Sequence, residues 1–270
     1  MERSRRFVVG ALLVALVSAF LASSPAIATE HDGPDERAAA RLDAMVNALS
    51  RATRLRATID ADWDVTQPTG EKIEFGETRV TTIRRPDRMR VETTRRDGTR
   101  RVFLFDGTQL AVFDVDLKVY ATAPRPGTLD AALDYLTQDL HMRMPLRELF
   151  AADLPRTLAP LRHTARWVDA DTIAGVATDH VFLRGNGTDL QMWIASQGDP
   201  LPRRIVITYR QEEGQPQFRA SFTEWNLSPE VPDELFAFTP EEGAEKIPFA
   251  VPGAATPSPA TGATPEEEGR

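Results

Sequence analysis

Hydrophobic positions along the chain repeat with two different periods, and the changes between them divide the sequence. From Asp35 to Arg51 the apolar residues recur every three or four positions, which predicts an amphipathic helix. From Ala57 to Val65 apolar and polar residues alternate instead, which predicts a strand with one apolar face. The chain therefore begins its ordered part with a helix and continues as strand.

Further segments show the strand pattern and are separated by Gly, Pro, Asn and Asp. They are residues 72–83, 88–94, 101–106, 109–115, 119–123, 164–170, 176–183, 189–195, 203–209 and 218–227. Short Asp-Gly and Gly-Asn-Gly links between several of them are typical of hairpins. The order predicts an antiparallel meander without parallel strands. In residues 72–83 the apolar register slips between Phe75 and Val80, which predicts a bulge near Gly76.

A helical period returns between Thr128 and Leu161 and interrupts the meander. Thr128 is a suitable N-cap for an apolar stripe, and two shorter helical turns are expected at 145–150 and 155–161. We therefore predict a mainly β (α+β) fold: a curled antiparallel sheet or half-open β-barrel of about 11 strands. The N-terminal helix and the insert 128–161, acting as a lid, would fill its concave side. A curled sheet of this size either packs a core or encloses a ligand.

The two ends of the chain differ from the part between them. Arginines at positions 3, 5 and 6, an apolar run over 7–21 and the small-x-small triplet Ala26-Ile27-Ala28 predict a signal peptide over residues 1–28. Cleavage after Ala28 would deliver the protein to the periplasm by the general or the twin-arginine route, with no integral membrane segment left. Residues 29–250 form one predicted domain, and residues 251–270, rich in Pro, Ala, Thr and Glu, a disordered tail.

Composition excludes several classes of function. The chain has no cysteine, which excludes disulfides, cysteine-bound metals and a cysteine nucleophile. Its net charge of −8 argues against a nucleic-acid partner. The four histidines lack metal-ligand spacing, and no nucleophile-elbow, P-loop or dinucleotide motif occurs. For Asp60, Asp62 and Asp64 a solvated strand face is favoured over a cation site. We therefore expect no enzyme activity, no cofactor and no metal.

The strand pattern also supplies candidate ligand-binding residues. Ile59, Trp63 and Val65 share one face of the first strand, and Met89 and Val91 share a face after the next turns. We expect these five side chains to line an apolar cavity on the concave side. The alternative is that they belong to a packed core.

A run of arginines is the most pronounced charge feature of this acidic chain. Eight arginines lie between residues 84 and 101. They belong either to a solvated hairpin face or to a docking patch for anionic head groups or an acidic partner. The patch would consist of Arg88, Arg90, Arg95, Arg96, Arg100 and Arg101.

Several segments resemble known periplasmic proteins. Residues 80–92 (VTTIRRPDRMRVE) resemble the strand–Arg-Pro–turn–strand segment of the periplasmic outer-membrane lipoprotein carriers. Residues 231–240 (VPDELFAFTP) resemble their closing P-x-x-x-F-x-F-x-P signature. Between them, residues 189–194 and 198–208 are similar to a domain-of-unknown-function family of predicted periplasmic proteins. The resemblance extends from about residue 35 to residue 247.

The resemblance implies an incomplete antiparallel barrel with a helical lid and an apolar cavity for acyl chains. In the carriers the arginine of the Arg-Pro pair helps to hold the lid, and Arg85 matches that position. The predicted function is a monomeric periplasmic carrier or binding protein for a lipid, a lipoprotein acyl chain or another hydrophobic small molecule, without covalent chemistry. The alternative is an envelope sensing or interaction module that uses the same sheet to bind a protein partner.

Overall fold

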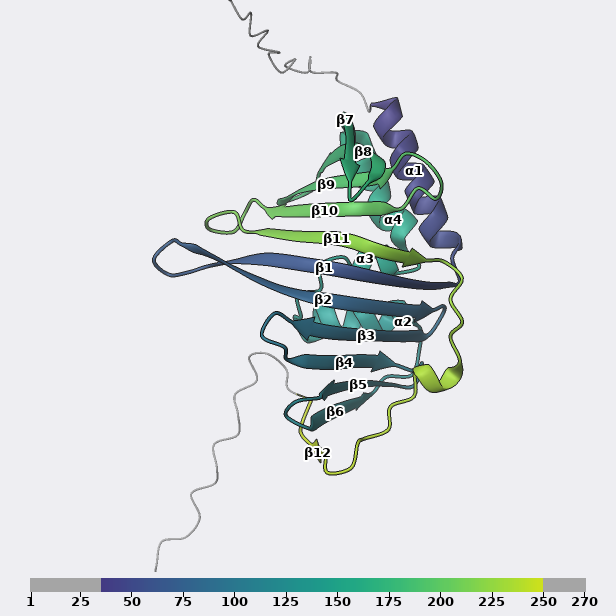
Figure 1. Ribbon diagram of the computed structural model, residues 1–270, viewed down its shortest axis with the longest axis vertical. Coiled ribbons are helices and arrows are strands. Elements are labelled where there is room, and N and C mark those ends of the chain that lie inside the picture. The colour runs from purple at the N-terminus through teal and green to yellow at the C-terminus, as the bar shows by residue number, and fades with distance from the viewer. Residues whose placement is uncertain (1–34, 250–270) are drawn as a thin grey trace, which may run out of the picture. The chain divides into compact units, whose positions relative to one another are not determined.

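One large sheet organises the protein. The computed structural model describes residues 35–249, so the predicted signal peptide (1–28) and tail (251–270) lie outside the described residues. Twelve strands form the sheet in the order β12-β6-β5-β4-β3-β2-β1-β11-β10-β9-β8-β7 (Figure 1). The sheet is curled and unclosed, with β12 and β7 at its edges. The predicted fold class is confirmed, with one short strand more than expected.

The strands follow the predicted segments closely. They are β1 (Arg54–Thr66), β2 (Lys72–Arg84), β3 (Arg88–Arg95), β4 (Arg100–Phe105), β5 (Gln109–Asp114), β6 (Val119–Pro124), β7 (Arg166–Ile173), β8 (Val176–Arg184), β9 (Thr188–Ala195), β10 (Pro202–Tyr209), β11 (Gln217–Asn226) and β12 (Glu245–Lys246). All neighbouring pairs are antiparallel except β12 and β6, which are parallel. Two meanders, β1–β6 and β7–β11, meet where β1 pairs with β11.

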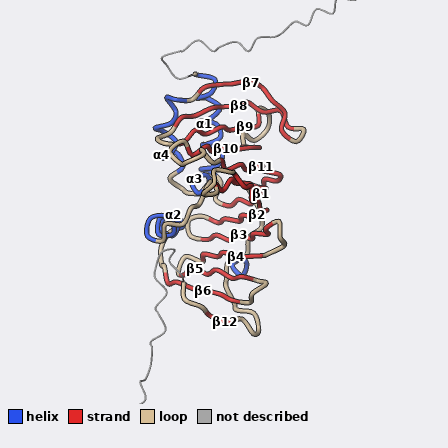
Figure 2. Tube along the Cα trace, turned by 90° about the vertical axis from the view of Figure 1, so that its left-hand side faces the viewer, coloured by secondary structure: helices blue, strands red, loops and turns tan. Residues whose placement is uncertain are grey.

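The α-helices lie on one side of the sheet, whereas a short 3-10 turn at Asp233–Leu235 lies on the other (Figure 2). The α-helices are α1 (Glu36–Arg51), α2 (Leu129–Asp134), α3 (Arg147–Phe150) and α4 (Leu154–Leu158), and the insert also has a π-helical turn at Tyr135–Asp139 and a 3-10 turn at Ala159–Thr164. We call the side with the α-helices the inner face and the opposite side the outer face. At the start of α1 the side chain of Asp35 accepts hydrogen bonds from the backbone N–H groups of Arg37 and Ala38, as expected of an N-cap.

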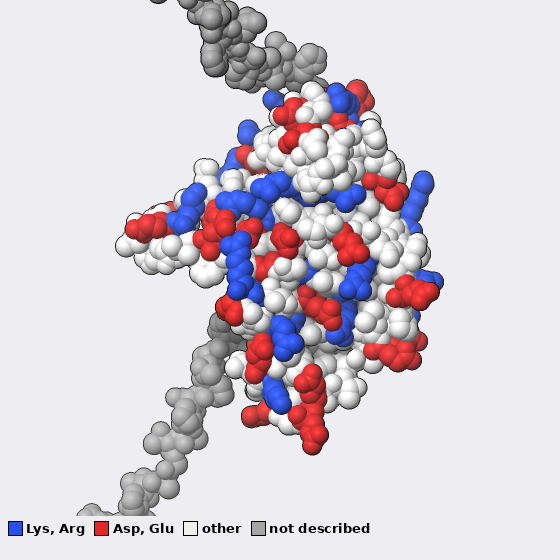
Figure 3. All heavy atoms as spheres, in the orientation of Figure 1, with Lys and Arg blue, Asp and Glu red and all other residues white. Residues whose placement is uncertain are grey.

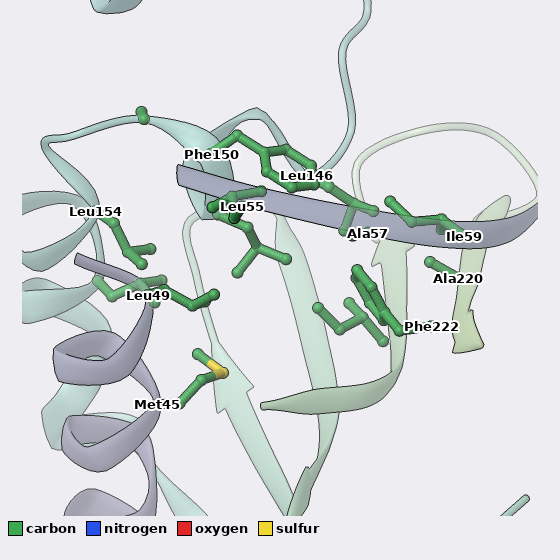
Figure 4. Packing of buried hydrophobic residues seen from close by; sticks show 14 of the residues in the cluster. Met45, Leu49, Leu55, Ala57, Ile59, Leu146, Phe150, Leu154, Ala220 and Phe222 are labelled. Atoms are coloured by element: carbon green, nitrogen blue, oxygen red, sulfur yellow. The ribbon is translucent and has the colours of Figure 1, made fainter. Parts of the chain in front are cut away.

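The hydrophobic core lies between the inner face and the helices at the end of the sheet where β1 begins (Figure 4). Met45 and Leu49 of α1 and Phe150 of α3 pack there against Leu55 and Ala57 of β1. All five are buried, and burial of each larger side chain stabilises the fold by about 1.5–3 kcal/mol. This packing attaches both α1 and the insert to the same strand.

The predicted bulge near Gly76 is wrong. β1 and β2 pair without a register shift from Arg54↔Arg84 to Thr66↔Lys72, and Gly76 lies opposite Asp62. A Cβ atom at position 76 would overlap the Asp62 carboxylate and the Arg96 guanidinium, which pair across it on the outer face. The glycine leaves room for this ion pair. A shift occurs instead where β1 meets β11, between Thr58 and Ile59.

No helix within residues 35–249 is both long enough and apolar enough to cross a membrane.

Candidate functional site

Two pockets lie between the inner face of the sheet and the insert. The first has a volume of about 270 Å³ and lies over β2, β3 and β4. The second has a volume of about 480 Å³ and lies over β9 and β10. The segment Arg143–Arg147 lines both pockets. The insert therefore divides the space above the sheet into two compartments.

Apolar side chains from sheet and insert form most of the first pocket. Met89 and Val91 project inward from β3 because alternate residues of a strand share a face. Val91 lies opposite Phe103 of β4 in the register, and Phe103 also lines the pocket. The insert contributes the facing wall with Leu133, Leu136, Leu146 and Phe150.

The five predicted cavity residues do not all lie in one cavity. Ile59, Met89 and Val91 line the first pocket. Trp63 lines a separate depression nearer the tip of the β1–β2 hairpin, and Val65 is exposed beyond it. The β1–β2 hairpin extends past β3 and β4 (Figure 1), so Trp63 lies outside the first pocket and shares its depression with Arg143 and Pro145 of the insert.

The second pocket was missed at the sequence level. Its walls come from α4 and the turn after it, and from the inward positions of β9 and β10. They include Leu158, Leu161, Leu190, Met192, Ile205, Ile207 and Tyr209. The same alternation that marks β1 is present in both strands, but alternation does not reveal whether a covering element fits tightly or leaves space.

Arg85 connects the ends of two helices. Its Nη1 donates to the carbonyl oxygens of Leu49 (3.1 Å) and Ala52, and its Nη2 donates to those of Phe150 (3.2 Å) and Ala151 (3.4 Å). These carbonyls end α1 and α3. Burial lowers the pKa of Arg85, and the negative charge of Asp130 partly offsets that effect. The contact to the insert is therefore made at α3 rather than at residues 128–140.

The arginine run is divided between the two faces of the sheet. Arg95 and Arg101 project inward and line the first pocket. The other four members of the predicted patch lie on the outer face, where each has a carboxylate partner: Arg88 with Asp87, Arg90 with Glu92, Arg96 with Asp62 and Arg100 with Asp116. Figure 3, which views the outer face, shows positive and negative groups interspersed. The six arginines therefore do not share one surface.

The three aspartates of β1 also lie on the outer face, each with its own partner. Asp60 accepts a hydrogen bond from Thr78 Oγ1 (2.8 Å), Asp62 pairs with Arg96, and Asp64 pairs with Arg219 (2.9 Å). Within residues 35–249, no group of three His, Cys, Asp or Glu side chains is arranged to hold a metal ion.

A curled β-sheet domain with a helical cover over partly open, mainly apolar pockets is the class of protein to which this chain conforms. Residues 38–250 match the family of predicted periplasmic proteins called DUF2092, and the chain belongs to this family. The expected relationship and the periplasmic location are thereby confirmed. No curated protein sequence matches the chain.

Several solved structures are similar in part. The Mycobacterium tuberculosis lipoprotein LppX has 14% sequence identity and a TM-score of 0.47, and the match covers 73% of this chain and 100% of LppX. For a LolA superfamily protein from Nitrosomonas europaea the identity is 12%, the TM-score 0.38 and the coverage 74% and 97%. For the Pseudomonas aeruginosa MucA/MucB complex the identity is 16% and the TM-score 0.41, and the match covers 75% of this chain and 61% of the other.

Proposed function

We propose that the protein binds or carries a hydrophobic ligand, such as a lipid or a lipoprotein acyl chain, in the two pockets above the sheet. The observation that supports this most is the pair of mainly apolar pockets, about 270 and 480 Å³, between sheet and insert. Transfer of an acyl chain from water into such a space is favourable by about 0.8 kcal/mol per CH₂. Binding then needs no covalent step.

Methionines supply an adaptable lining for such a ligand. Met89, Met142 and Met144 line the first pocket, and Met144 and Met192 line the second. A methionine side chain is unbranched and polarizable, so it fits ligands of varied shape. Four of the chain's six methionines are at these pockets, which supports selection for an apolar chain rather than for one rigid molecule.

Arg85 would act as a latch that holds the insert, which covers the pockets, in place. It joins the end of α3 to the end of α1 through backbone carbonyls, as described above. A guanidinium has five N–H donors in a fixed fork, so one side chain serves several carbonyls at once. Holding α3 in place would fix the wall of the first pocket that Leu146 and Phe150 form.

The experiment combines extraction with a matched pair of variants. Protein purified from the periplasm is extracted with organic solvent, and mass spectrometry is used to look for a bound lipid. Binding of the apolar dye N-phenyl-1-naphthylamine is then compared between Thr93→Trp and Thr94→Trp. Thr93 lines the first pocket, whereas the adjacent Thr94 is exposed and projects from the opposite face.

We expect the wild-type protein to co-purify with a lipid and to bind the dye saturably. Thr93→Trp should weaken dye binding several-fold because the indole occupies the pocket, and Thr94→Trp should leave it unchanged. Absence of both lipid and dye binding in the folded wild type would contradict the proposal.

A second function, recognition of a protein segment, is favoured by the β1–β2 hairpin. Beyond the insert its inner face exposes Val65, Ile73 and Phe75, with 39%, 46% and 46% of their surface accessible. Exposed apolar side chains grouped in this way often mark interaction sites. A photo-crosslinking residue at Ile73 should then give one defined protein adduct in the periplasm. The same residue at Thr78, on the outer face, should give none.

A further inference from the structure

We infer that the ligand of the first pocket is an amphiphile with an anionic head group, a phosphate or a carboxylate, which binds at a group of arginines at the pocket mouth. This inference rests on the proposed function and specifies its ligand class. The mouth arginines are Arg79, Arg95, Arg101 and Arg143. They come from β2, β3, β4 and the insert, respectively.

The pocket is polar at one end and apolar at the other. Along β3, Met89 and Val91 line the apolar part of the pocket. Thr93 and Arg95 follow toward the end of β3 that turns into β4. On β4, Phe103 and Arg101 repeat this order, and the register places Arg101 opposite Thr93. An elongated ligand in the pocket therefore meets hydrocarbon first and guanidinium groups at the end away from Arg85.

Three of the four mouth arginines also line the adjoining depression. Arg79, Arg95 and Arg143 contribute to both, together with Glu77. A head group placed between the two spaces would thus be surrounded by three guanidinium groups from β2, β3 and the insert. Trp63 contributes an apolar ring to the lining of the depression.

The charges at the mouth leave one arginine without a carboxylate. Arg79 pairs with Glu77, Arg101 with Asp114 (3.1 Å) and Arg143 with Glu212. Within residues 35–249, no carboxylate lies at ion-pair distance from Arg95, whose charge acts only at longer range on Asp97 in the turn after β3. In contrast, Arg88, Arg90, Arg96 and Arg100 on the outer face each form an ion pair. An anion would supply the missing partner for Arg95.

The remaining donors of the cluster are suited to the same anion. Each guanidinium carries five N–H groups, and one carboxylate partner uses only part of them. The side chains of Arg101 and Arg143 remain 47% and 59% exposed, so their free N–H groups can turn toward a head group. Guanidinium forks match the geometry of phosphate and carboxylate oxygens.

The test uses competitors that carry the same type of alkyl chain but different head groups. N-phenyl-1-naphthylamine bound to the full protein is displaced by dodecyl phosphate, dodecanoate or dodecanol. The two anions are used below their micelle concentrations and dodecanol below its solubility limit, and inorganic phosphate is tested alongside. The double variant Arg95→Gln/Arg101→Gln is compared with Arg96→Gln/Arg100→Gln. Both double variants remove two positive charges from the β3–β4 hairpin. The first removes them from the inner face and the second from the outer face.

In the wild type, at least one anionic competitor should displace the dye at about tenfold lower concentration than dodecanol, which corresponds to about 1.4 kcal/mol. Which of the two is stronger identifies the head group. The preference should disappear in the inner-face variant and persist in the outer-face variant, with dodecanol unaffected in both. Inorganic phosphate should not displace the dye, because it lacks the chain.

Two results would overturn the inference without touching the proposed function. One is equal displacement by dodecanol and both anions in the wild type. The other is an equal loss of preference in both double variants, which would indicate a general charge effect. Failure of the wild type to bind the dye at all would instead contradict the proposed function.

Discussion

Arg85 supplies hydrogen-bond donors to the C-termini of two helices at once. A helix leaves its last four carbonyl groups without intrahelical partners, so α1 and the short α3 both need external donors. The cation also lies where helix ends carry partial negative charge. One side chain thus couples the N-terminal helix to the insert.

Replacement of Arg85 by leucine should lower the free energy of unfolding by about 2–4 kcal/mol, because several buried carbonyls would lose their donors. Urea denaturation measures this change. Arg88→Leu is the control, since Arg88 pairs only with its neighbour Asp87, and it should change stability by less than about 0.5 kcal/mol.

The proposed latch adds a second readout to the Arg85 comparison. Amide hydrogen exchange over 128–150 should accelerate in Arg85→Leu and not in Arg88→Leu. Equal exchange in the two variants would leave Arg85 as a purely local contact.

Asp179 is the carboxylate that fastens α1 to the sheet. Burial by itself would raise the pKa of Asp179, but hydrogen bonds from Trp167 (3.0 Å) and Arg37 (2.7 Å) and the charge of Arg41 (2.8 Å) hold that pKa below its ordinary value of 3.8. The folded state therefore favours the charged form. Its contribution to stability is present at neutral pH and is lost as the pH falls below 3.8 toward the folded pKa.

Asp179→Asn should therefore cost about 2 kcal/mol at neutral pH, and the difference from the wild type should shrink below pH 3.8. Denaturation curves at several pH values test this. Asp169→Asn, on the neighbouring strand and largely exposed, should have little effect at neutral pH. A cost that did not change with pH would contradict the electrostatic explanation.

Among the elements, the β1–β2 hairpin differs most from an ordinary sheet segment. Both strands have 13 residues, whereas β3 has eight and β4 six. The hairpin tip therefore has no neighbouring strand on the β3 side and no insert above it. Its stability comes from cross-strand pairs such as Trp63 and Phe75, whose rings stack with centroids 6.3 Å apart.

A double-mutant cycle on Trp63→Ala and Phe75→Ala should give a coupling energy of about 1 kcal/mol, as expected of an aromatic pair. Because Trp63 is only half-buried, the single change should cost less than the roughly 3–5 kcal/mol of a fully buried tryptophan. Thermal denaturation of the four proteins supplies the values. Trp63→Ala combined with Phe238→Ala should be additive, since Phe238 packs against Phe113 and Tyr120 instead.

For the whole molecule, an unclosed sheet has two edges that must be prevented from pairing with other chains. β12 covers one of them: the N–H groups of Glu245 and Ile247 donate to Lys118 (2.9 Å) and Tyr120 (2.8 Å) of the β6 segment. The chain reaches this edge after crossing the outer face, where Arg84 donates to the carbonyl of Val231 (3.1 Å).

A chain that ends at Gly243 should associate in a concentration-dependent manner, because β6 would then present unpaired backbone groups. Light scattering during size-exclusion chromatography measures the association. A chain that ends at Phe249 keeps β12 and is the control. If both truncated proteins elute with the same mass at every concentration, β12 does not protect the edge.

The periodicity of the sequence is sufficient to predict the longer elements and their order. Alternation located eleven strands to within a few residues, and the stripe from Ala38 to Leu49 located α1, because these periods follow from the local geometry of the backbone. The two-residue β12 lacked such a signal. For the site, alternation placed Ile59, Met89 and Val91 on one face of their strands but left open whether they line a pocket or pack in a core.

What covers each face of the sheet, and where that cover ends, depends on tertiary contacts. Alternation shows that Arg95 and Arg96 point to opposite sides, but not that one side meets a pocket and the other meets Asp62 and Glu74. Likewise, Trp63 continues the pattern of Ile59 yet lines a separate depression instead of the first pocket. The second pocket and the partners of Arg85 depend on contacts between segments far apart in the chain, which no local period records.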